Sequence, residues 1–230
     1  MSDRQSASRK FLPRDYRGQQ VTVTYDIKRC LHAAECVRRA PAAFDKDRRP
    51  WIMPDADSVE AVVAAVLACP TGALRFERKD ARQVEQVPAA NIIWVVEDGP
   101  LYLRGDIEIV NGDGELLHRD TRLALCRCGQ SANKPFCDNA HLSAGFRAAG
   151  VNRTIVTRTD SAATGGRLRV IPSPDGSYKI SGAHTLFHAA ESANVEAEPI
   201  GISLCRCGQS GSKPYCDGSH RRVAFRDPGW

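Results

Sequence analysis

Short runs in which apolar and polar residues alternate recur along the chain and predict a protein built largely of β-strands. The clearest run is 21–25, which reads Val-Thr-Val-Thr-Tyr and places its valines on one face of a strand. Other short runs rich in Val, Ile, Leu and Tyr predict strands at 92–97, 101–104, 106–110 and 168–171. Clusters of Gly, Pro, Asn and Asp separate several of these runs, so we expect tight turns between neighbouring strands.

A helical pattern interrupts the strands in the N-terminal third. Apolar residues recur at positions 59, 62, 63, 66 and 67, which form one face of a helix. Asp57 or Ser58 would cap its start, and the Cys69-Pro70 pair would end it. A returning strand at 73–77 and a linker at 78–88 follow. The fold class predicted is α+β, with a small α+β domain at 21–86 ahead of a β-rich remainder.

The β-rich remainder contains an internal repeat. Residues 126–141 read CRCGQSANKPFCDNAH and residues 205–220 read CRCGQSGSKPYCDGSH, with the same spacing throughout. Weaker similarity upstream relates 101–105 to 177–182. We therefore expect two copies of one supersecondary unit, in 87–150 and 151–230, packed about a pseudo-twofold axis.

Composition and charge narrow the function classes. The chain is 42% hydrophobic and 26% charged, as in globular proteins, and no apolar run approaches the roughly 20 residues of a membrane helix. The N-terminus lacks the apolar core of a secretory signal. The net charge is +5, but residues 1–29 hold seven Lys or Arg against three acidic residues, which predicts a flexible basic tail at 1–20. We expect a cytoplasmic protein that binds neither membranes nor nucleic acid.

Nine cysteines change this picture, because a reducing cytoplasm disfavours structural disulfides. They form three groups of three: Cys30, Cys36 and Cys69; Cys126, Cys128 and Cys137; and Cys205, Cys207 and Cys216. An odd total in regular groups favours metal or redox chemistry.

Each repeat combines three thiols with an imidazole in the pattern C-x-C-x8-C-x3-H. The Cys-x-Cys pair brings two sulfurs near one metal, and the third Cys and the His share a face of a helical turn. On spacing alone, a Cys3His zinc site and an iron–sulfur cluster both remain open. Flanking basic residues would either offset the charge of a cluster or remain as solvated surface charges; they are Arg127, Lys134, Arg206 and Lys213.

The complete motif resembles the signature of CDGSH iron–sulfur domains, the mitoNEET-like family: C-x-C-x2-[S/T]-x3-P-x-C-D-G-[S/T]-H. Residues 205–220 match every defined position, and residues 126–141 depart at Asn139-Ala140, where the signature has Gly and Ser or Thr. Asn tolerates a left-handed backbone, so the turn should be preserved, whereas Ala140 lacks a hydroxyl that could tune the site's potential.

This resemblance implies one 2Fe–2S cluster in each motif. Two cysteines would bind one iron, and a Cys–His pair would bind the outer iron nearer to solvent. The implied ligands are Cys126, Cys128, Cys137 and His141 in the first motif and Cys205, Cys207, Cys216 and His220 in the second.

The N-terminal trio Cys30, Cys36 and Cys69 resembles a single-cluster bacterial ferredoxin, in which C-x2-C-x2-C precedes a later Cys-Pro pair. Ala33 stands at the middle cysteine position. Three remaining thiols imply a 3Fe–4S cluster. The alternatives are a 4Fe–4S cluster with a non-Cys ligand such as His32, and a degenerate domain with ordinary cysteines.

We therefore expect an electron carrier, rather than an enzyme in its own right, that serves a redox partner protein. A His ligand leaves a cluster less negative than four thiolates do and so raises its potential. Delivery of clusters to apo-protein acceptors and service as the redox subunit of a partner oxidoreductase are the alternatives. The tandem repeat supplies an internal pseudo-dimer, so a monomer is expected.

Overall fold

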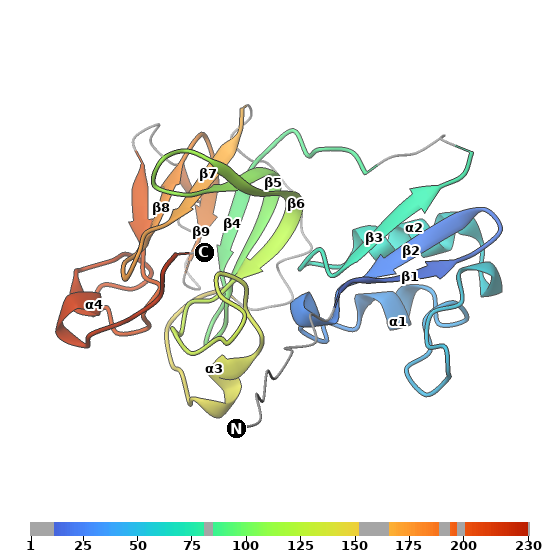
Figure 1. Cartoon of the computed structure of the whole chain (residues 1–230), viewed down its shortest axis with the longest axis horizontal. Coiled ribbons are helices and arrows are strands. Elements are labelled where there is room, and N and C mark those ends of the chain that lie inside the picture. The colour runs from blue at the N-terminus through green and yellow to red at the C-terminus, as the bar shows by residue number, and fades with distance from the viewer. Residues whose placement is uncertain (1–11, 81–84, 152–165, 189–193, 197–200, 230) are drawn as a thin grey trace, which may run out of the picture.

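The structure, a computed structural model, describes residues 12–80, 85–151, 166–188, 194–196 and 201–229. A small domain of strands and helices, at the right of Figure 1, leads into a β-rich body at the left. The predicted fold class, α+β with a β-rich tandem unit, is confirmed.

Three antiparallel strands form the sheet of the N-terminal domain, in the order β1-β2-β3. They span Arg14–Arg17, Val21–Tyr25 and Leu74–Arg78, which confirms the strands expected at 21–25 and 73–77. The prediction that the basic tail extends to residue 20 is wrong, because β1 pairs with β2 and buries Tyr16 in the domain core.

Helix α2 (Val59–Leu67) covers this sheet and confirms the predicted helix. The Ser58 side chain accepts a hydrogen bond from the Ala61 N–H, as the predicted N-cap requires. The segment around the N-terminal cysteines is partly helical, with η1 at Ile27–Arg29 and α1 at Glu35–Arg39. A further short turn, η2, spans Pro54–Ala56.

One mixed sheet organises the β-rich body. Its strands are β4 (Ile92–Val95), β5 (Leu101–Val110), β6 (Leu116–Leu125), β7 (Leu168–Pro172), β8 (Tyr178–Ser181), β9 (Thr185–Phe187), β10 (Asn194–Glu196) and β11 (Ile202–Leu204). The order is β10-β9-β4-β5-β7-β8-β11, with β6 paired to β5. The two strands expected at 101–104 and 106–110 are one strand, with a register shift between Arg104 and Ile107.

The expected pseudo-twofold relation is visible in the pairing of the strands. Each repeat contributes an antiparallel set, β4-β5-β6 in the first and β7-β8-β11 in the second. The two sets then exchange parallel contacts, because β5 pairs with β7 while β9 pairs with β4. The repeats therefore share one sheet, and their inward-facing Val, Ile and Leu side chains form one core.

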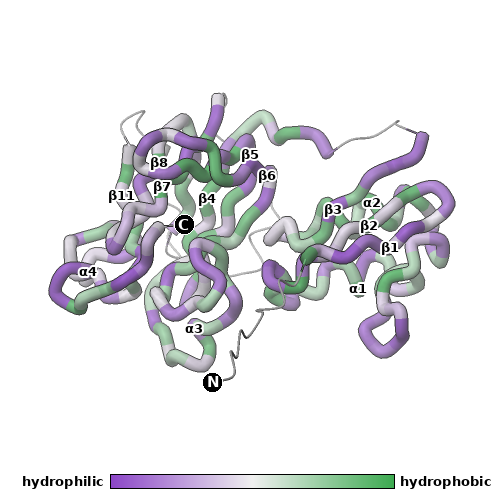
Figure 2. Tube along the Cα trace, in the orientation of Figure 1, coloured by the Kyte–Doolittle hydropathy of each residue, from purple (hydrophilic) through white to green (hydrophobic). Residues whose placement is uncertain are grey.

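Hydrophobic residues follow this architecture (Figure 2), concentrating on the central strands and on α2, whereas the exposed loops are mostly hydrophilic. Among the described residues, no helix combines the length and the apolar character needed to cross a membrane. Each repeat ends in a loop that carries a short helix, α3 (Ala140–Ser143) or α4 (Ser219–Arg222), and the two predicted motifs lie in these loops.

Candidate iron–sulfur sites

The first motif begins where β6 ends. Cys126 Sγ and Cys128 Sγ lie 3.7 Å apart, and Cys137 Sγ lies 3.5 Å from His141 Nδ1. The four side chains expected to act together therefore form two close pairs on one loop.

The second motif repeats this arrangement after β11. Cys205 Sγ and Cys207 Sγ are 3.9 Å apart, and Cys216 Sγ lies 3.4 Å from His220 Nδ1. The shared spacing of the two sequences thus produces the same geometry twice.

An aspartate fixes the shape of each loop. Asp138 accepts hydrogen bonds from the Ala132 and Ala140 N–H groups, at 2.8 and 3.0 Å. Asp217 accepts the equivalent bonds from Gly211 and Ser219, and the bonds from Ser219 and Gly211 hold the pKa of its carboxyl well below the usual range. The motif aspartate therefore ties the middle of each loop to the start of its short helix.

The departure at Asn139-Ala140 preserves the backbone and removes one contact. Asn139 has a φ of 70°, close to the 85° of Gly218, so the expectation of a tolerated left-handed turn is confirmed. In the second motif the Ser219 hydroxyl accepts a hydrogen bond from Arg222, a contact that Ala140 cannot make.

The arginine between the first two cysteines is buried in both motifs. Arg127 is 1% exposed and donates to the Gly99 and Ala149 carbonyl oxygens, and burial lowers its pKa to about 10. Arg206 is equally buried and donates to the Gly176 carbonyl oxygen. Neither is a solvated surface charge. The repeated Cys-Arg-Cys sequence was the only signal of this role, and it does not reveal burial.

The two motif loops meet backbone to backbone. A Cβ atom added at Gly129 would lie 2.6 Å from the Cys207 carbonyl oxygen, and one at Gly208 would lie 2.5 Å from the Cys128 carbonyl oxygen. Only glycine permits this reciprocal approach. The Cys-x-Cys segments of the two motifs are thus direct neighbours.

The two sites differ in burial. In the first motif Cys126, Cys128, Cys137 and His141 are all at most 7% exposed. In the second, Cys205 and Cys207 are buried, whereas Cys216 and His220 are only half-buried. The Cys–His pair of the second motif therefore lies nearer to solvent, as expected, while the pair of the first motif is covered.

Each Cys-x-Cys pair is poised to lose a proton. A hydrogen bond from Cys126 lowers the pKa of Cys128 to about 7, and a hydrogen bond from Cys207 lowers the pKa of Cys205 to about 6. The thiolate is the form that binds a metal, so these thiols suit metal ligation near neutral pH.

The N-terminal trio also converges. Cys30, Cys36 and Cys69 line one small cavity, together with Ala33 and Tyr25. Burial, and then the nearby Cys69 and Cys30 thiols, raise the pKa of Cys36 to about 11. A bound cation would stabilise the Cys36 thiolate and so lower this pKa. The structure brings together the three thiols that the sequence predicted.

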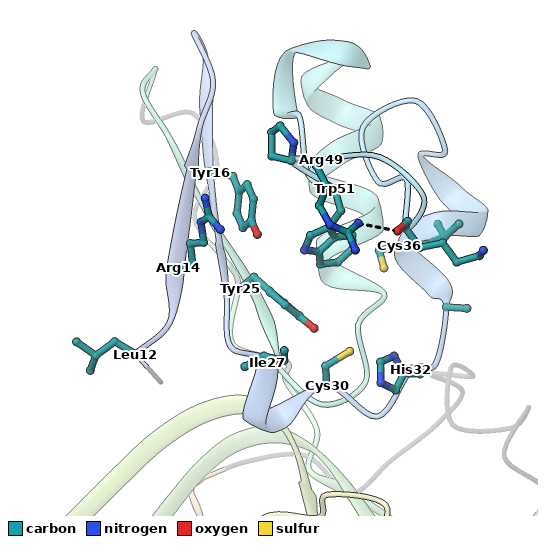
Figure 3. A pocket seen from close by; sticks show the side chains of 14 residues that line it. Leu12, Arg14, Tyr16, Tyr25, Ile27, Cys30, His32, Cys36, Arg49 and Trp51 are labelled. Atoms are coloured by element: carbon teal, nitrogen blue, oxygen red, sulfur yellow. Dashed lines mark hydrogen bonds between the residues drawn. The ribbon is translucent and has the colours of Figure 1, made fainter. Parts of the chain in front are cut away.

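A larger cavity of about 660 Å³ adjoins the trio (Figure 3). Tyr16, Tyr25 and Trp51 line it, and burial and then the neighbouring Cys30 thiol raise the pKa of Tyr25 well above its usual value. His32 lies beside Cys30 in the same view, with a left-handed φ of 54°. The chain therefore offers an imidazole beside one of the three thiols, that of Cys30.

Comparisons with known proteins agree with these geometries. Residues 16–79 match the family described as divergent 4Fe-4S mono-cluster, and residues 98–142 and 175–221 each match the family described as iron-binding zinc finger CDGSH type. A 66-residue segment, 29% of this chain, is 39% identical to the protein "Uncharacterized protein YjdI" of Escherichia coli K12 and covers 87% of it. The counterpart in Escherichia coli O157:H7 matches equally. No solved structure matches the chain. The chain belongs to the iron–sulfur proteins that join a divergent 4Fe-4S mono-cluster domain to two CDGSH segments.

Proposed function

We propose that this protein is an electron carrier that holds one 2Fe–2S cluster in each CDGSH loop and a third cluster at the N-terminal trio. The ligands proposed for the CDGSH loops are Cys126, Cys128, Cys137 and His141, and Cys205, Cys207, Cys216 and His220. The burial of six of these eight side chains is the observation that carries the proposal.

The pairing of the side chains supports a two-iron cluster over a single zinc ion. Each loop presents one thiol pair and one thiol–imidazole pair, with separations of 3.4–3.9 Å within each pair. Throughout the described ranges, no three His, Cys, Asp or Glu side chains are grouped as a single metal ion requires. Two pairs, each suited to one iron, match the donor set of a binuclear cluster with bridging sulfides.

Burial favours electron transfer over cluster delivery. Six of the eight proposed ligands are at most 7% exposed, and the backbones of the two loops approach each other closely at Gly129 and Gly208. A cluster in such a site can exchange electrons while it stays bound, because electron tunnelling does not require the loop to open. Release of the cluster to an acceptor does require the loop to open. The imidazole ligand raises the potential, which favours acceptance of an electron.

The second CDGSH loop is the proposed contact for a redox partner protein. Cys216 and His220 are half-buried there, so a partner can approach that cluster closely. Arg221, Arg222 and Arg226 are exposed around the loop and would favour an acidic partner surface.

The N-terminal trio is proposed to hold a cubane-type cluster. Three thiols and Ala33 around one cavity suit a 3Fe–4S cluster with one vacant corner. His32 beside Cys30 would instead supply the fourth ligand of the 4Fe–4S cluster named in the matching family's description.

The test is a redox titration of the purified full-length chain, with iron and acid-labile sulfide counted before and after. We expect about four of each from the CDGSH loops, and about seven irons and eight sulfides with an additional 3Fe–4S cluster. The spectrum should bleach and recover over repeated cycles of reduction and oxidation without loss of iron. A colourless protein with about two zinc ions, or loss of iron on each cycle, would contradict the proposal.

Cluster delivery is the second candidate, and the exposure of Cys216 and His220 favours it for the second loop alone. Incubation with an apo-ferredoxin separates the two functions. Delivery predicts transfer of the second cluster to the acceptor, whereas electron transfer predicts retention of both CDGSH clusters.

A further inference from the structure

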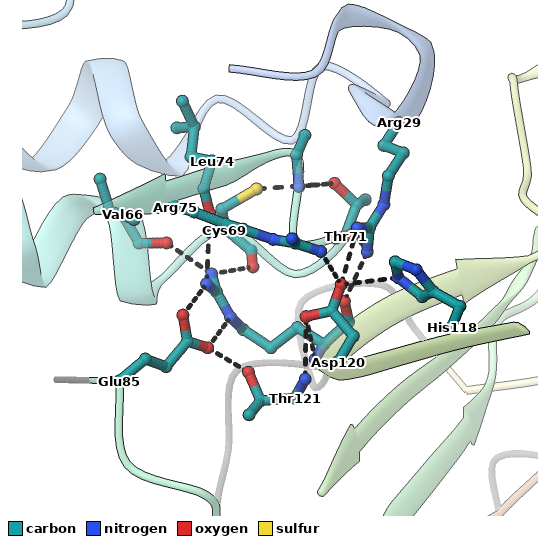
Figure 4. Close-up of polar contacts among 12 residues, drawn as sticks. Arg29, Val66, Cys69, Thr71, Leu74, Arg75, Glu85, His118, Asp120 and Thr121 are labelled. Carbon is teal, nitrogen blue, oxygen red and sulfur yellow. Dashed lines mark hydrogen bonds and ion pairs between the residues drawn. The ribbon is translucent and has the colours of Figure 1, made fainter. Parts of the chain in front are cut away.

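A buried ionic network docks the N-terminal domain onto the body (Figure 4). Arg29, from η1, is 5% exposed and donates to Asp120 of β6 at 2.6 Å. Arg75 of β3 reaches the same carboxylate at 2.6 Å, and Arg122 of β6 donates back to the Cys69 carbonyl oxygen at 2.8 Å. The contacts run in both directions between the two parts, so the domain is held in one position.

This docking places the N-terminal trio against the first CDGSH loop. Leu31 follows Cys30 directly, is 3% exposed, and belongs to the same hydrophobic cluster as Cys137. Arg29 lies over the Phe136 ring, with 5.0 Å between the guanidinium carbon and the ring centroid. A neighbour of one proposed ligand therefore packs with a proposed ligand of the other site.

Two asparagines of the first loop make the polar contacts. The Asn139 side-chain amide donates to the Leu31 carbonyl oxygen at 3.4 Å, and the Asn133 amide donates to the Lys28 carbonyl oxygen at 3.0 Å. The Asn139 backbone N–H also faces Cys137 Sγ, at 3.5 Å. Asn139 thus connects the carbonyl group of Leu31, the residue after Cys30, with the sulfur of Cys137.

The second loop lacks both amides. Ser212 stands at the position of Asn133, and Gly218 stands at the position of Asn139. Asn139 is one of the two residues at which the first motif departs from the CDGSH signature, and it makes a contact with the N-terminal domain while keeping the required backbone turn.

We propose that the first CDGSH site is the middle member of an internal electron relay, with the N-terminal site on one side and the second CDGSH site on the other. The Leu31–Asn139 contact provides the first connection, and the close approach of Gly129 to Cys207 and of Gly208 to Cys128 provides the second. In each step one site loses one electron and its neighbour gains that electron, so the internal transfer needs no external reactant. This inference rests on the proposed electron-transfer function and adds the order of the sites.

Electron paramagnetic resonance on the loaded full-length chain tests this order. The chain is reduced stepwise with sodium dithionite, and the N-terminal signal is inspected for magnetic broadening by a neighbouring reduced cluster. We expect broadening in the wild type and in Cys216→Ser, which disables the second site, but loss of broadening in Cys137→Ser, which disables the first. Broadening that survives in Cys137→Ser, or that is lost in Cys216→Ser, would overturn the order.

A matched pair of variants tests Asn139 as a positioning residue and leaves every proposed ligand in place. Asn139→Gly gives the first loop the residue of the second, and Gly218→Asn makes the reverse change in a turn of the same handedness. After flash reduction, Asn139→Gly should lose the fast electron equilibration between the N-terminal and first CDGSH sites, while Gly218→Asn should retain it. Equal rates in both variants and the wild type would remove Asn139 from the relay.

The two levels of the proposal fail separately. If the wild-type clusters do not cycle reversibly, the electron-transfer function itself is wrong. If they cycle reversibly but the N-terminal signal responds equally to both CDGSH sites, only the relay is wrong.

Discussion

His141 and His220 occupy equivalent positions in the two motifs and differ in their surroundings, since His141 is 7% exposed and His220 is half-buried. Replacement of either ring by Cys would add one negative charge to its cluster. We expect each His→Cys variant to keep its cluster and to lower the potential by roughly 100 mV or more, as protein-film voltammetry would measure. The shift should be larger at His141, because a charge acts more strongly where water is excluded. Unchanged potentials in both variants would mean that these rings are not ligands.

Ala33 is the single residue that separates the N-terminal loop from a four-cysteine ferredoxin pattern. It lines the same cavity as Cys30, Cys36 and Cys69, so Ala33→Cys should supply a fourth thiolate. We expect the as-isolated wild type to show the resonance of an oxidised 3Fe–4S cluster, and the variant to lose it and gain about one iron per chain. If both proteins instead show a 4Fe–4S signal on reduction, His32→Ala becomes the informative variant, and the vacant-corner interpretation is wrong.

At the scale of elements, the two CDGSH loops depend on glycine where their backbones meet. Gly129→Ala would place a methyl group 2.6 Å from the Cys207 carbonyl oxygen, so the loops must separate. Gly145→Ala is the control, because Gly145 shares the left-handed backbone, with a φ of 61°, but has no atom within 4 Å of the added Cβ. Each variant carries backbone strain of about 1–3 kcal/mol, and Gly129→Ala should lose at least about 1 kcal/mol more in denaturant unfolding. It should also weaken the magnetic coupling between the two reduced CDGSH clusters. Equal losses of stability and unchanged coupling would show that the loops tolerate the methyl group.

The elements predicted correctly from the sequence are those determined by residues close together along the chain. The alternation at 21–25, the Ser58 cap and the spacing of the two motifs each specify structure within a few residues, and each is confirmed. The parallel contact of β4 with β9 joins segments about 90 residues apart and has no local signal. For the same reason the burial of Arg127 and the docking role of Asn139 could not be predicted, since both depend on partners that only the tertiary fold supplies.

At the scale of the whole molecule, the buried carboxylate of Asp120 joins the two parts of the chain. Burial raises the pKa of this carboxyl, but the hydrogen bond from His118 and the charges of Arg29 and Arg75 outweigh burial and hold the pKa well below the usual range. A depressed pKa means that the carboxylate stabilises the folded state above the unfolded value of 3.8, and that this contribution is lost only as the pH falls through the folded pKa. The docking is therefore fully effective at neutral pH.

Gly72 allows the two parts to come together around this carboxylate. It has a left-handed φ of 64°, and a Cβ atom there would meet the Arg122 carbonyl oxygen and lie 2.6 Å from Arg29 Nη2. We expect Gly72→Ala to destabilise the folded chain by about 2–4 kcal/mol, because backbone strain adds to a broken buried hydrogen bond. Gly112→Ala, where the added Cβ has no neighbour within 4 Å, should change stability by less than about 1 kcal/mol.

Limited proteolysis tests the docking of the two parts. It should cleave Gly72→Ala between the domain and the body faster than the wild type, while the CDGSH clusters remain bound. Asp120→Asn keeps the shape and removes the charge, so it should reproduce the faster cleavage if the ionic network holds the domain in place. Wild-type cleavage rates in both variants would show that the apolar contacts of Leu31 suffice for docking.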